Sequence, residues 1–470
     1  MTGTVMQTDP ATLAEGVNLL WVLVVTFLIF FMHAGFAMLE AGQVRAKNVA
    51  NQLTKNMLTW SVGVTVFFLI GAGISSLAGW LTAGMSGEAP GLLATWTMGS
   101  SGLVSWLFGA VFAMTAATIV SGAVAGRARL RAYVGYTILL AAVIYPVVAG
   151  LVWGGGLLAG SGPLGNLLGV GFHDFAGGMI VHGMGGLAGL TAAAVIGARL
   201  GRFEKGSVNV IPGHSITFAV LGTLILAFGW YGFNVGTAAT VFAPGSDTLA
   251  LGAFANVGAV ALATTLGMAA GAMGAGAAAW YKTGKVDTLY VANGMLAGLV
   301  GVTAIADAIV WPGALLVGFL AGVQLPIVFG FVEKRLHIDD VCAVFPVHGS
   351  AGILGALAFP FVATEFWSGA SGVAWLASQF AAQVIGVGVI AAWTVGATAA
   401  VFYTFKLAGQ ARVTPEHERE GLDSSEHGVE TYPEFGVGDE APIMADGGMV
   451  ASERSRTADD SVVEHGGDHE

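Results

Sequence analysis

The stretch DFAGGMIVHGMGGLAGL, residues 174–190, decides the fold, because it places Asp174 and His182 in a run that is otherwise small and apolar. A second stretch, DVCAVFPVHGSAGILGAL at residues 340–357, repeats the pattern. In both, the histidine follows the acid by eight positions, valine precedes it, and glycines follow it at one, four and seven positions. Two related segments therefore carry ionisable groups into apolar surroundings.

The composition of the whole chain indicates a membrane protein. Of its 470 residues, 55% are hydrophobic and only 10% are charged, and the mean hydropathy is +0.76. A soluble protein of this length needs far more charge to cover its surface, whereas repeated apolar runs of about 20 residues are typical of a polytopic protein in a lipid bilayer. The single cysteine, Cys342, excludes a disulfide framework and a multi-cysteine metal site.

Apolar windows between polar breaks predict an all-α polytopic membrane protein with eleven transmembrane helices. The first apolar run has no Lys or Arg before it and is too long for a signal-peptide core, so we expect it to be retained. The predicted spans are residues 17–39, 57–80, 102–124, 132–153, 174–197, 211–236, 251–280, 288–306, 309–332, 341–362 and 375–406.

The distribution of basic residues tests this topology independently of hydropathy. With an external N-terminus, all 18 Lys and Arg fall into internal loops or after the last span. The loop groups are Arg45, Lys47 and Lys55; Arg127, Arg129 and Arg131; Arg199, Arg202 and Lys205; Lys282 and Lys285; and Lys334 and Arg335. This pattern predicts an odd number of spans in the plasma membrane, with a cytoplasmic C-terminus.

The chain divides into four predicted regions. An external segment, 1–16, precedes the membrane domain, 17–406. Residues 407–470 hold 16 Asp and Glu against four Arg, so the net charge of −11 belongs to this tail. Its composition predicts disorder in isolation, and we divide it into a cytoplasmic segment, 407–435, and an acidic tail, 436–470.

The two histidine stretches enter the membrane from opposite sides, on spans five and ten. Two five-span halves of opposite orientation, spans 1–5 and 6–10, followed by a final helix, form an inverted-topology repeat, whose site tends to lie at mid-membrane. Helical spacing places each histidine on a glycine-lined face suited to close packing. Eight helical residues put each histidine roughly 12 Å below its own membrane surface. We therefore expect His182 and His348 to meet near the middle.

Several roles are open for these polar groups. A buried histidine can simply hydrogen-bond a neighbouring helix, but ionisable groups within a membrane usually mark a pathway or relay. Two imidazoles could bind copper or zinc, yet no third ligand lies nearby in the sequence, so no metal is expected. Asp174 can be a pathway residue or a helix N-cap, and Asp340 a cap. Roles in helix packing or loop anchoring are expected for Glu40, His33, Asn234 and Asn256.

Aromatic residues gather near the predicted outer mouth. Trp230, Phe233 and Thr237 lie three and four positions apart on span six, and Phe108 and Phe112 lie four apart on span three. A lipid-facing aromatic belt is the common role of such residues. Their position at the mouth also permits a collar that binds a cation through aromatic faces.

Six stretches, in this order, resemble the ammonium transporter family (Amt/Mep/Rh): MLEAGQVRAKNVANQLTKN, YPVVAGLVWGGGLLAG, HDFAGGMIVHGMGGLAGL, GWYGFNVGT, DVCAVFPVHGSAGILGAL and EREGLDSSEHGVETYPEF. They cover nearly the whole membrane body and the early tail, and the first is closer to the ammonium-transporter branch than to Rh proteins. The resemblance implies a homotrimer with one eleven-helix pore in each subunit.

The resemblance also implies the roles of the site residues. Trp153, Phe112 and Thr237, beside Phe108, form an external ammonium site, and Phe112 and Phe233 close it as stacked rings. Asp174 is the essential acid, His182 and His348 are twin pore histidines, and Trp230 lines the pore. Thr237 stands where many family members carry serine, so the hydroxyl is kept and a methyl group is added.

The function implied is ammonium transport, with no enzymatic activity, cofactor or nucleic-acid partner. Ammonium, or its analogue methylammonium, binds the collar, loses a proton near Asp174 and crosses as ammonia, whereas potassium has no proton to lose. The paired imidazoles can pass the proton by exchanging tautomers. If the proton travels along them while ammonia moves separately, uptake is electrogenic, which the resemblance favours. The alternatives are an Rh-type neutral channel for ammonia or carbon dioxide, and an ammonium sensor that signals through its tail.

Residues 412–435 resemble the regulatory C-terminus of the family. They are expected to pack on the cytoplasmic face and to help a PII-type signalling protein block the exits. An ammonium sensor usually carries an appended signalling domain, which 64 mostly acidic residues leave no room for. No Ser–His, paired-Asp or zinc motif indicates an intramembrane enzyme.

Overall fold

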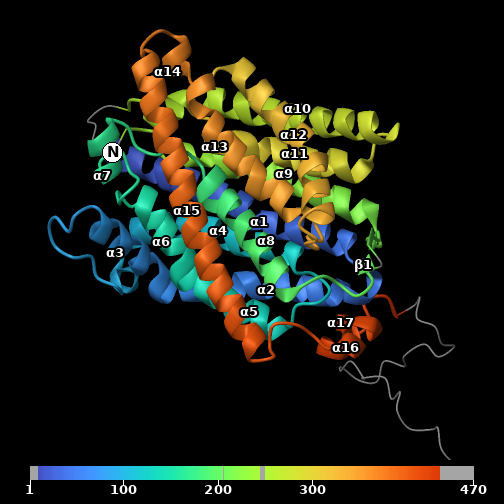
Figure 1. Cartoon of the computed structure of the whole chain (residues 1–470). Coiled ribbons are helices and arrows are strands. Elements are labelled where there is room, and N and C mark those ends of the chain that lie inside the picture. The colour runs from blue at the N-terminus through green and yellow to red at the C-terminus, as the bar shows by residue number, and fades with distance from the viewer. Residues whose placement is uncertain (1–8, 205, 244–248, 434–470) are drawn as a thin grey trace, which may run out of the picture.

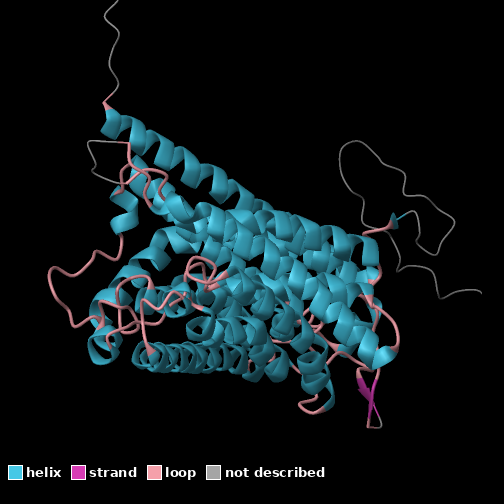
Figure 2. Cartoon of the chain, turned by 90° about the horizontal axis from the view of Figure 1, so that it is seen from above, coloured by secondary structure: helices cyan, strands magenta, loops and turns pink. Residues whose placement is uncertain are grey.

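The computed structural model describes residues 9–204, 206–243 and 249–433, which form a bundle of long helices (Figure 1, Figure 2). Ten helical segments in this part are long and apolar enough to cross a membrane, and an eleventh, Thr288–Thr303, is shorter. Each predicted span overlaps one of these segments, and the all-α membrane fold is confirmed. The acidic tail, 436–470, lies outside the described residues.

The bundle is almost entirely helical. Its helices are α1 (Pro10–Gln43), α2 (Val49–Val66), α3 (Ala72–Thr82), α4 (Ser100–Ala123), α5 (Leu130–Leu139), α6 (Tyr145–Val152), α7 (Pro163–Leu168), α8 (Met184–Ile196), α9 (Ile216–Asn234), α10 (Val257–Thr283), α11 (Thr288–Thr303), α12 (Trp311–Lys334), α13 (Ser350–Val362), α14 (Thr364–Trp367), α15 (Val373–Leu407), α16 (Pro415–Glu420) and α17 (Leu422–His427). Short 3₁₀ turns are η1 (Ala46–Asn48), η3 (Ala94–Thr97), η6 (Val235–Ala238) and η7 (Ala253–Asn256). One antiparallel hairpin, β1 (Phe203–Glu204) with β2 (Ser207–Val208), stands at the edge of the bundle (Figure 2).

Wide π-helical turns continue four of the helices. They are η2 (Phe67–Gly71) after α2, η4 (Leu140–Ile144) after α5, η5 (Gly178–Gly183) before α8 and η8 (Phe345–Gly349) before α13. His182 lies in η5 and His348 in η8. Such turns are rare and are frequent at functional sites. A helical period in the sequence does not distinguish a π turn from an α-helix, so these turns were not predicted.

The start of the second span differs from the prediction. It was expected at residue 57, with Lys55 in an internal loop, but the helix begins at Val49. Lys55 is fully buried within α2, and so are the neighbouring polar side chains of Gln52 and Asn56. The prediction was wrong because the polar stretch forms hydrogen bonds inside the bundle, so its polarity does not report exposure to water.

The histidine spans also begin later than expected. Residues 172–177 are not helical, and η5 begins at Gly178 instead of residue 174. The tenth span begins at Phe345, four residues after the predicted start at 341. The depth of roughly 12 Å for each histidine was calculated from eight helical residues, and this calculation does not apply, because residues 174–177 and 340–343 are not helical and the histidines lie in π turns.

The first helices of the two halves pack tightly against each other. α1 lies alongside α9 over most of its length. A Cβ atom on Gly222 of α9 would lie 2.2 Å from the backbone nitrogen of Leu39, which no side chain permits. Small residues at such seams let membrane helices approach closely, as the sequence pattern predicts for an inverted repeat.

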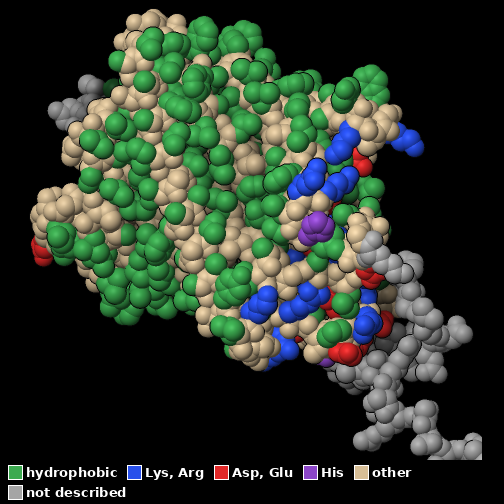
Figure 3. All heavy atoms as spheres, viewed as in Figure 1, with side chains coloured by type: hydrophobic (Ala, Val, Ile, Leu, Met, Phe, Trp, Pro, Cys, Tyr) green, Lys and Arg blue, Asp and Glu red, His purple; other side chains and the backbone are tan. Residues whose placement is uncertain are grey.

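One end of the bundle carries the basic residues, and we call it the basic end. Lys and Arg side chains gather there over the ends of α10, α12 and α15 (Figure 3). The two short helices α16 and α17 pack at the same end (Figure 1). Outside this end the visible surface is largely apolar (Figure 3), as expected for a protein surrounded by lipid.

Candidate functional site

The two histidines of the repeat face each other in the core of the bundle. Their Nδ1 atoms are 3.2 Å apart, and their rings lie nearly parallel with centroids 5.3 Å apart. His182 is fully buried, and only 4% of His348 is exposed. The glycines beside them bring the two segments together, because a Cβ atom on Gly186 would lie 2.1 Å from the backbone nitrogen of Gly349. One Nδ1 must donate and the other accept, so the contact holds one hydrogen.

A continuous column of contacting aromatic rings leads from these histidines toward the end of the bundle opposite the basic end. The Trp230 ring stacks on His182 with centroids 4.7 Å apart, and its Nε1 donates to the hydroxyl of Thr303 at 2.8 Å. Phe233 lies 5.2 Å from His182 and 4.2 Å from Phe112, between centroids. The structure therefore brings residues from α4, α9 and both π turns into one column.

The column of rings ends at an aromatic cluster that reaches the surface. Phe112 meets Phe108 at 4.9 Å and the edge of Trp153 at 5.8 Å, between centroids. Trp153 is 41% exposed, whereas Phe112 is buried. The hydroxyl of Thr237, one turn after Phe233, donates to the Phe233 carbonyl at 2.8 Å. All aromatic residues predicted for the outer site therefore lie in one connected group.

Asp174 caps the π turn that carries His182. Its carboxylate oxygens accept four backbone N–H groups, from Gly177, Gly178, Met179 and Ile180, at 2.8 to 2.9 Å. Its backbone carbonyl accepts the Trp153 Nε1–H at 2.8 Å. Of the two roles left open for Asp174, this geometry favours the cap. Asp340 caps the other turn, since its oxygens accept the N–H groups of Val344 and Phe345.

A narrow cavity lies on the other side of His348, toward the basic end. Its volume of about 10 Å³ is close to the lower limit for a single water molecule. Its walls include Phe36, Glu40, Asn293, Cys342, Val344 and His348. The Phe36 ring lies 6.2 Å from the ring of His348, between centroids. No sequence pattern indicates this cavity, because its walls come from four distant segments.

Glu40 is held by polar side chains from two neighbouring helices. Its carboxylate accepts hydrogen bonds from Gln52 and Asn56 of α2 and from Ser121 of α4, each at 2.7 Å. The expected anchoring role of Glu40 is thus observed. The sequence did not predict one residue of the site. This residue is Thr303, whose hydroxyl accepts the hydrogen bond from Trp230 and which no motif in the sequence indicates.

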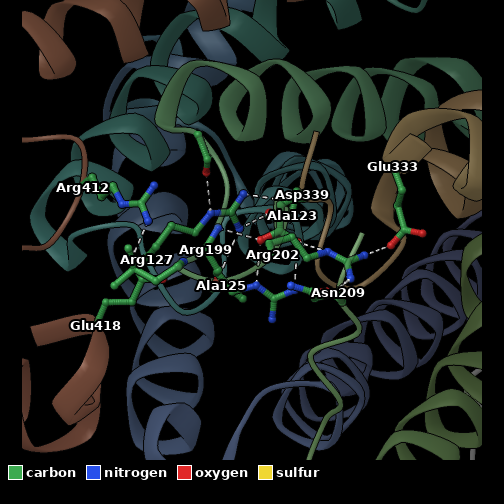
Figure 4. Close-up of polar contacts among 12 residues, drawn as sticks. Ala123, Ala125, Arg127, Arg199, Arg202, Asn209, Glu333, Asp339, Arg412 and Glu418 are labelled. Carbon is green, nitrogen blue, oxygen red and sulfur yellow. Dashed lines mark hydrogen bonds and ion pairs between the residues drawn. The ribbon is translucent and has the colours of Figure 1, made fainter. Parts of the chain in front are cut away.

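At the basic end, buried arginines tie the loops together (Figure 4). Arg199 forms two side-chain hydrogen bonds with Asp339, at 2.8 and 2.9 Å, and Arg202 pairs with both Asp339 and Glu333. Arg127 donates to the Asp339 carbonyl at 2.6 Å. Burial favours a raised pKa for the Asp339 carboxyl, but the hydrogen bonds and charges of Arg199 and Arg127 outweigh it and hold that pKa below its usual range.

The segment after the last long helix docks on this arginine layer and on α2. Asp423 accepts the backbone N–H groups of Ala50 and Asn51 at 3.0 and 2.9 Å. Glu418, which pairs with Arg412 at 2.6 Å (Figure 4), also accepts the backbone N–H of Leu200, the residue after Arg199, at 2.6 Å. The predicted packing of this segment against the membrane domain is therefore observed through residue 433.

Among the described residues, no group of three or more His, Cys, Asp and Glu is placed to hold a metal ion. The connected features are instead an exposed tryptophan, a column of rings, a pair of imidazoles and a small cavity. Such an arrangement offers a cation-binding aromatic face at one end and a proton-exchanging pair at its centre.

Comparison with known proteins agrees with the resemblance seen in the sequence. The model of the Ammonium Transporter Family matches residues 20–432. The chain is 68% identical to the protein named Ammonium transporter Amt2 from Haloferax mediterranei over 453 residues, which cover 95% of this chain and 97% of that protein. It is 40% identical to Ammonium transporter Amt2 from Methanocaldococcus jannaschii, covering 90% of this chain and 93% of that protein.

Solved structures show the same fold. A structure named Sensor Amt Protein superimposes with a TM-score of 0.77 at 30% identity, covering 88% of this chain and 99% of that chain. The crystal structure of Saccharomyces cerevisiae Mep2 superimposes with a TM-score of 0.69, covering 93% of this chain and 95% of that chain. At 23% identity, the second comparison supports the fold alone.

Proposed function

Since this chain belongs to the ammonium transporter family and is an ammonium transporter by that membership, we propose that it binds ammonium at the exposed aromatic cluster, removes a proton and conducts ammonia along the ring column. The observation that carries this mechanism is the continuous column of contacting rings from Trp153 through Phe112, Phe233 and Trp230 to His182 and His348. It connects a surface cation site to buried titratable groups.

Energy decides why the ion is deprotonated. Moving an ion of this size into a medium of low dielectric costs on the order of 20 kcal/mol in the Born limit. Removing a proton from an amine with the pKa of lysine costs roughly 4–5 kcal/mol at pH 7. Passage as ammonia is therefore the cheaper route through an apolar column, and potassium has no such route.

The outer site binds the cation in two ways. The faces of Trp153, Phe112 and Phe108 attract a cation by a cation–π interaction. The Thr237 hydroxyl already donates its hydrogen to the Phe233 carbonyl, so its oxygen keeps lone pairs to accept an N–H from ammonium. Potassium gains the first interaction but cannot donate the hydrogen bond.

The gate consists of Phe112 and Phe233. Their centroids are 4.2 Å apart, which leaves no space for a molecule between the two rings. Passage of ammonia thus requires these rings to move. Asp174 supports the step at this point by its negative charge and by fixing Trp153 and the start of η5, because its own oxygens are occupied by four N–H groups.

The histidine pair carries the released proton. A hydrogen on one Nδ1 can transfer to the other over 3.2 Å while the donor ring takes up a proton at Nε2 and the acceptor ring releases one from Nε2, so the two rings exchange tautomers. Separate movement of ammonia and proton makes uptake electrogenic. Return of the proton to the outer side makes it a neutral Rh-type channel, and charge movement distinguishes the two.

The proposed orientation in the membrane and the proposed partners rest on the topology. The basic end faces the cytoplasm under the positive-inside rule, which places the N-terminus outside and the protein in the plasma membrane. Exposed apolar side chains such as Phe27 on α1 and Phe228 on α9 suit contact with lipid or with the other subunits of a homotrimer. The docked segment through residue 433 offers a surface to a PII-type signalling protein at the exits.

An ammonium sensor is the second candidate, because the solved structure matched over 99% of its chain is named Sensor Amt Protein. Both candidates are tested with purified protein in liposomes adsorbed on a solid-supported membrane. An electrogenic transporter gives a saturable current on ammonium or methylammonium pulses and none on potassium pulses. A neutral channel admits ammonia without current, and a sensor gives neither flux nor current.

A further inference from the structure

A buried carboxylate stands beside the cavity below His348. Glu40 lies on α1, four residues after Phe36, and is only 2% exposed. Four helical residues correspond to a rise of about 6 Å. Since the Phe36 ring is 6.2 Å from the His348 ring, Glu40 lies one helical turn closer to the basic end than that contact. It is an acid in the wall of this cavity, together with His348.

The hydrogen bonds of Glu40 leave one of its oxygens poorly satisfied. Oε2 accepts N–H groups from Gln52 and Asn56, each at 2.7 Å. Oε1 has only the Ser121 hydroxyl, at 2.7 Å, and that same hydroxyl also lies within 2.7 Å of Oε2 and of the Thr118 carbonyl. A hydroxyl has one hydrogen to donate, so Oε1 keeps lone pairs for another partner.

Oε1 lies near two other residues of the cavity wall. A Cβ atom on Gly122 would lie 3.0 Å from Oε1 of Glu40 and 3.1 Å from side-chain atoms of Cys342 and Val344. Glu40, Cys342 and Val344 all line the cavity. The absence of a side chain at Gly122 therefore leaves free space beside this carboxylate oxygen and beside two residues of the cavity wall.

A buried ammonium group balances the charge of Glu40. Lys55 of α2 is fully buried, and its Nζ has no hydrogen-bond partner in the described part of the chain. Its charge acts on the Glu40 carboxylate without forming a close ion pair. An isolated charge of either sign is costly inside a membrane protein. The pair lets the Glu40 carboxyl lose a proton there without leaving a net buried charge.

We propose that Glu40 is the proton-exchange group at the cavity below His348, on the side of the basic end, where ammonia that has passed His348 becomes ammonium again. This inference rests on the proposed function. The O–H bond of the Glu40 carboxylic acid breaks as an N–H bond forms on ammonia, giving ammonium and a carboxylate. The carboxylate regains a proton from a water molecule in the cavity, and that water takes a proton from the His348 ring.

An anchoring role alone makes a different prediction for the amide variant. In Glu40→Gln the amide oxygen can still accept from Gln52 and Asn56, and the amide nitrogen can donate to Ser121, so the connection between helices survives. What is lost is the capacity to take up and release a proton. A purely structural glutamate therefore predicts normal transport by a folded Glu40→Gln protein.

The test measures ammonium current in liposomes on a solid-supported membrane, with size-exclusion chromatography and thermal unfolding as checks of folding. We expect Glu40→Gln to reduce the current at least tenfold relative to the unaltered protein, Glu40→Asp to restore part of it, and Gln52→Ala, which keeps the carboxylate, to retain more than half. A folded Glu40→Gln protein with more than half of the current overturns the inference.

A second variant leaves Glu40 in place and covers it. In Gly122→Ala the new methyl group lies 3.0 Å from Oε1 and beside two residues of the cavity wall, so we expect a loss of at least fivefold in the ammonium current. The control is Gly301→Ala, whose Cβ atom meets Ala321 at the same distance of 3.0 Å, away from the cavity. If Glu40→Gln does not fold, full current in folded Gly122→Ala overturns the inference. Absence of current in the unaltered protein contradicts the proposed function instead.

Discussion

His182 and His348 lie 166 positions apart in the chain, yet their Nδ1 atoms are 3.2 Å apart in the core of the bundle. Each ring lies in a π turn that follows an aspartate cap, and glycines bring the two turns into backbone contact. The pairing is therefore built symmetrically from both halves of the chain. Currents and stabilities of variants test what this arrangement contributes to transport.

Removal of one imidazole interrupts the proposed proton path. We expect His182→Ala to lower the ammonium current at least tenfold, because the remaining ring has no partner for exchange. The control is His33→Ala, which removes another buried histidine that has no hydrogen-bond partner among the described residues. Equal, selective currents in His182→Ala and the unaltered protein contradict the relay.

Under the proposed function, the hydroxyl of Thr237 contributes to ammonium binding at the outer site. Thr237→Val keeps the shape but removes the acceptor, so we expect about a tenfold rise in the half-saturating ammonium concentration, the effect of one hydrogen bond of roughly 1.4 kcal/mol. Thr237→Ser keeps the hydroxyl and should change that concentration by about twofold at most. Saturation curves of the current distinguish them, and equal curves for Val and Thr remove the hydroxyl from the site.

Asp174 is expected to act mainly through structure. Its carboxylate accepts four backbone N–H groups, whereas that of Asp340 accepts two. Hydrogen bonds to a charged group are worth about 1.5–3 kcal/mol each. Thermal unfolding should therefore show a larger drop in apparent Tm for Asp174→Asn than for Asp340→Asn. The reverse order contradicts the capping role.

The arginine layer at the basic end depends on Asp339. Asp339→Asn leaves three buried guanidinium groups without their common counter-charge, and we expect a loss of about 3–5 kcal/mol in unfolding free energy. Because the pKa of Asp339 is lowered in the folded protein, its contribution is present above its ordinary value of 3.8 and is lost as pH falls below that. Unfolding midpoints measured from pH 3 to pH 7 test both points, with Asp287→Asn as the exposed control.

Docking of the C-terminal segment should weaken in mild acid. Asn51 lies 3.0 Å from Nε2 of His427, which accepts the amide N–H only in the neutral ring. Burial lowers the pKa of His427 below its ordinary 6.5, although the nearby Asp423 and Glu426 act in the opposite direction. A group whose folded pKa is depressed in this way costs docking free energy once the free segment takes up a proton.

Hydrogen exchange of residues 422–433 checks this expectation. Protection should be full above about pH 7 and should decrease as pH falls through 6.5, the ordinary pKa of a free histidine. His427→Gln offers Asn51 a carbonyl acceptor that does not titrate, so its protection should not change over this range. Equal pH dependence in both proteins excludes His427 as the cause.

The sequence was sufficient for the features that depend on pattern. Apolar windows and the one-sided basic residues located the spans, and the shared spacing around His182 and His348 located the repeat and its centre. The aromatic residues of the outer site were found because they lie at helical spacing or in stretches that resemble the family.

Other features depend on tertiary contacts and left no local signal. Lys55 was expected in a loop because its neighbours are polar, but those neighbours bind Glu40 from α1. The π turns at both histidines lie in runs whose residues suit an ordinary helix equally well. The cavity below His348 exists only because residues from α1, α4, α11 and the η8 region converge there.

In the proposed relay, the single hydrogen between the two Nδ1 atoms limits how often a proton can cross. Each proton that crosses leaves both rings with their hydrogens on the wrong sides, so the rings must turn over, or hydrogens must shuffle back, before the next one can follow. The relay therefore has two steps, which are transfer of a proton and return of both rings to their starting tautomers. In this relay, stacking of Trp230 on His182 restrains rotation of the His182 ring, so the tightness of that packing limits the transport rate.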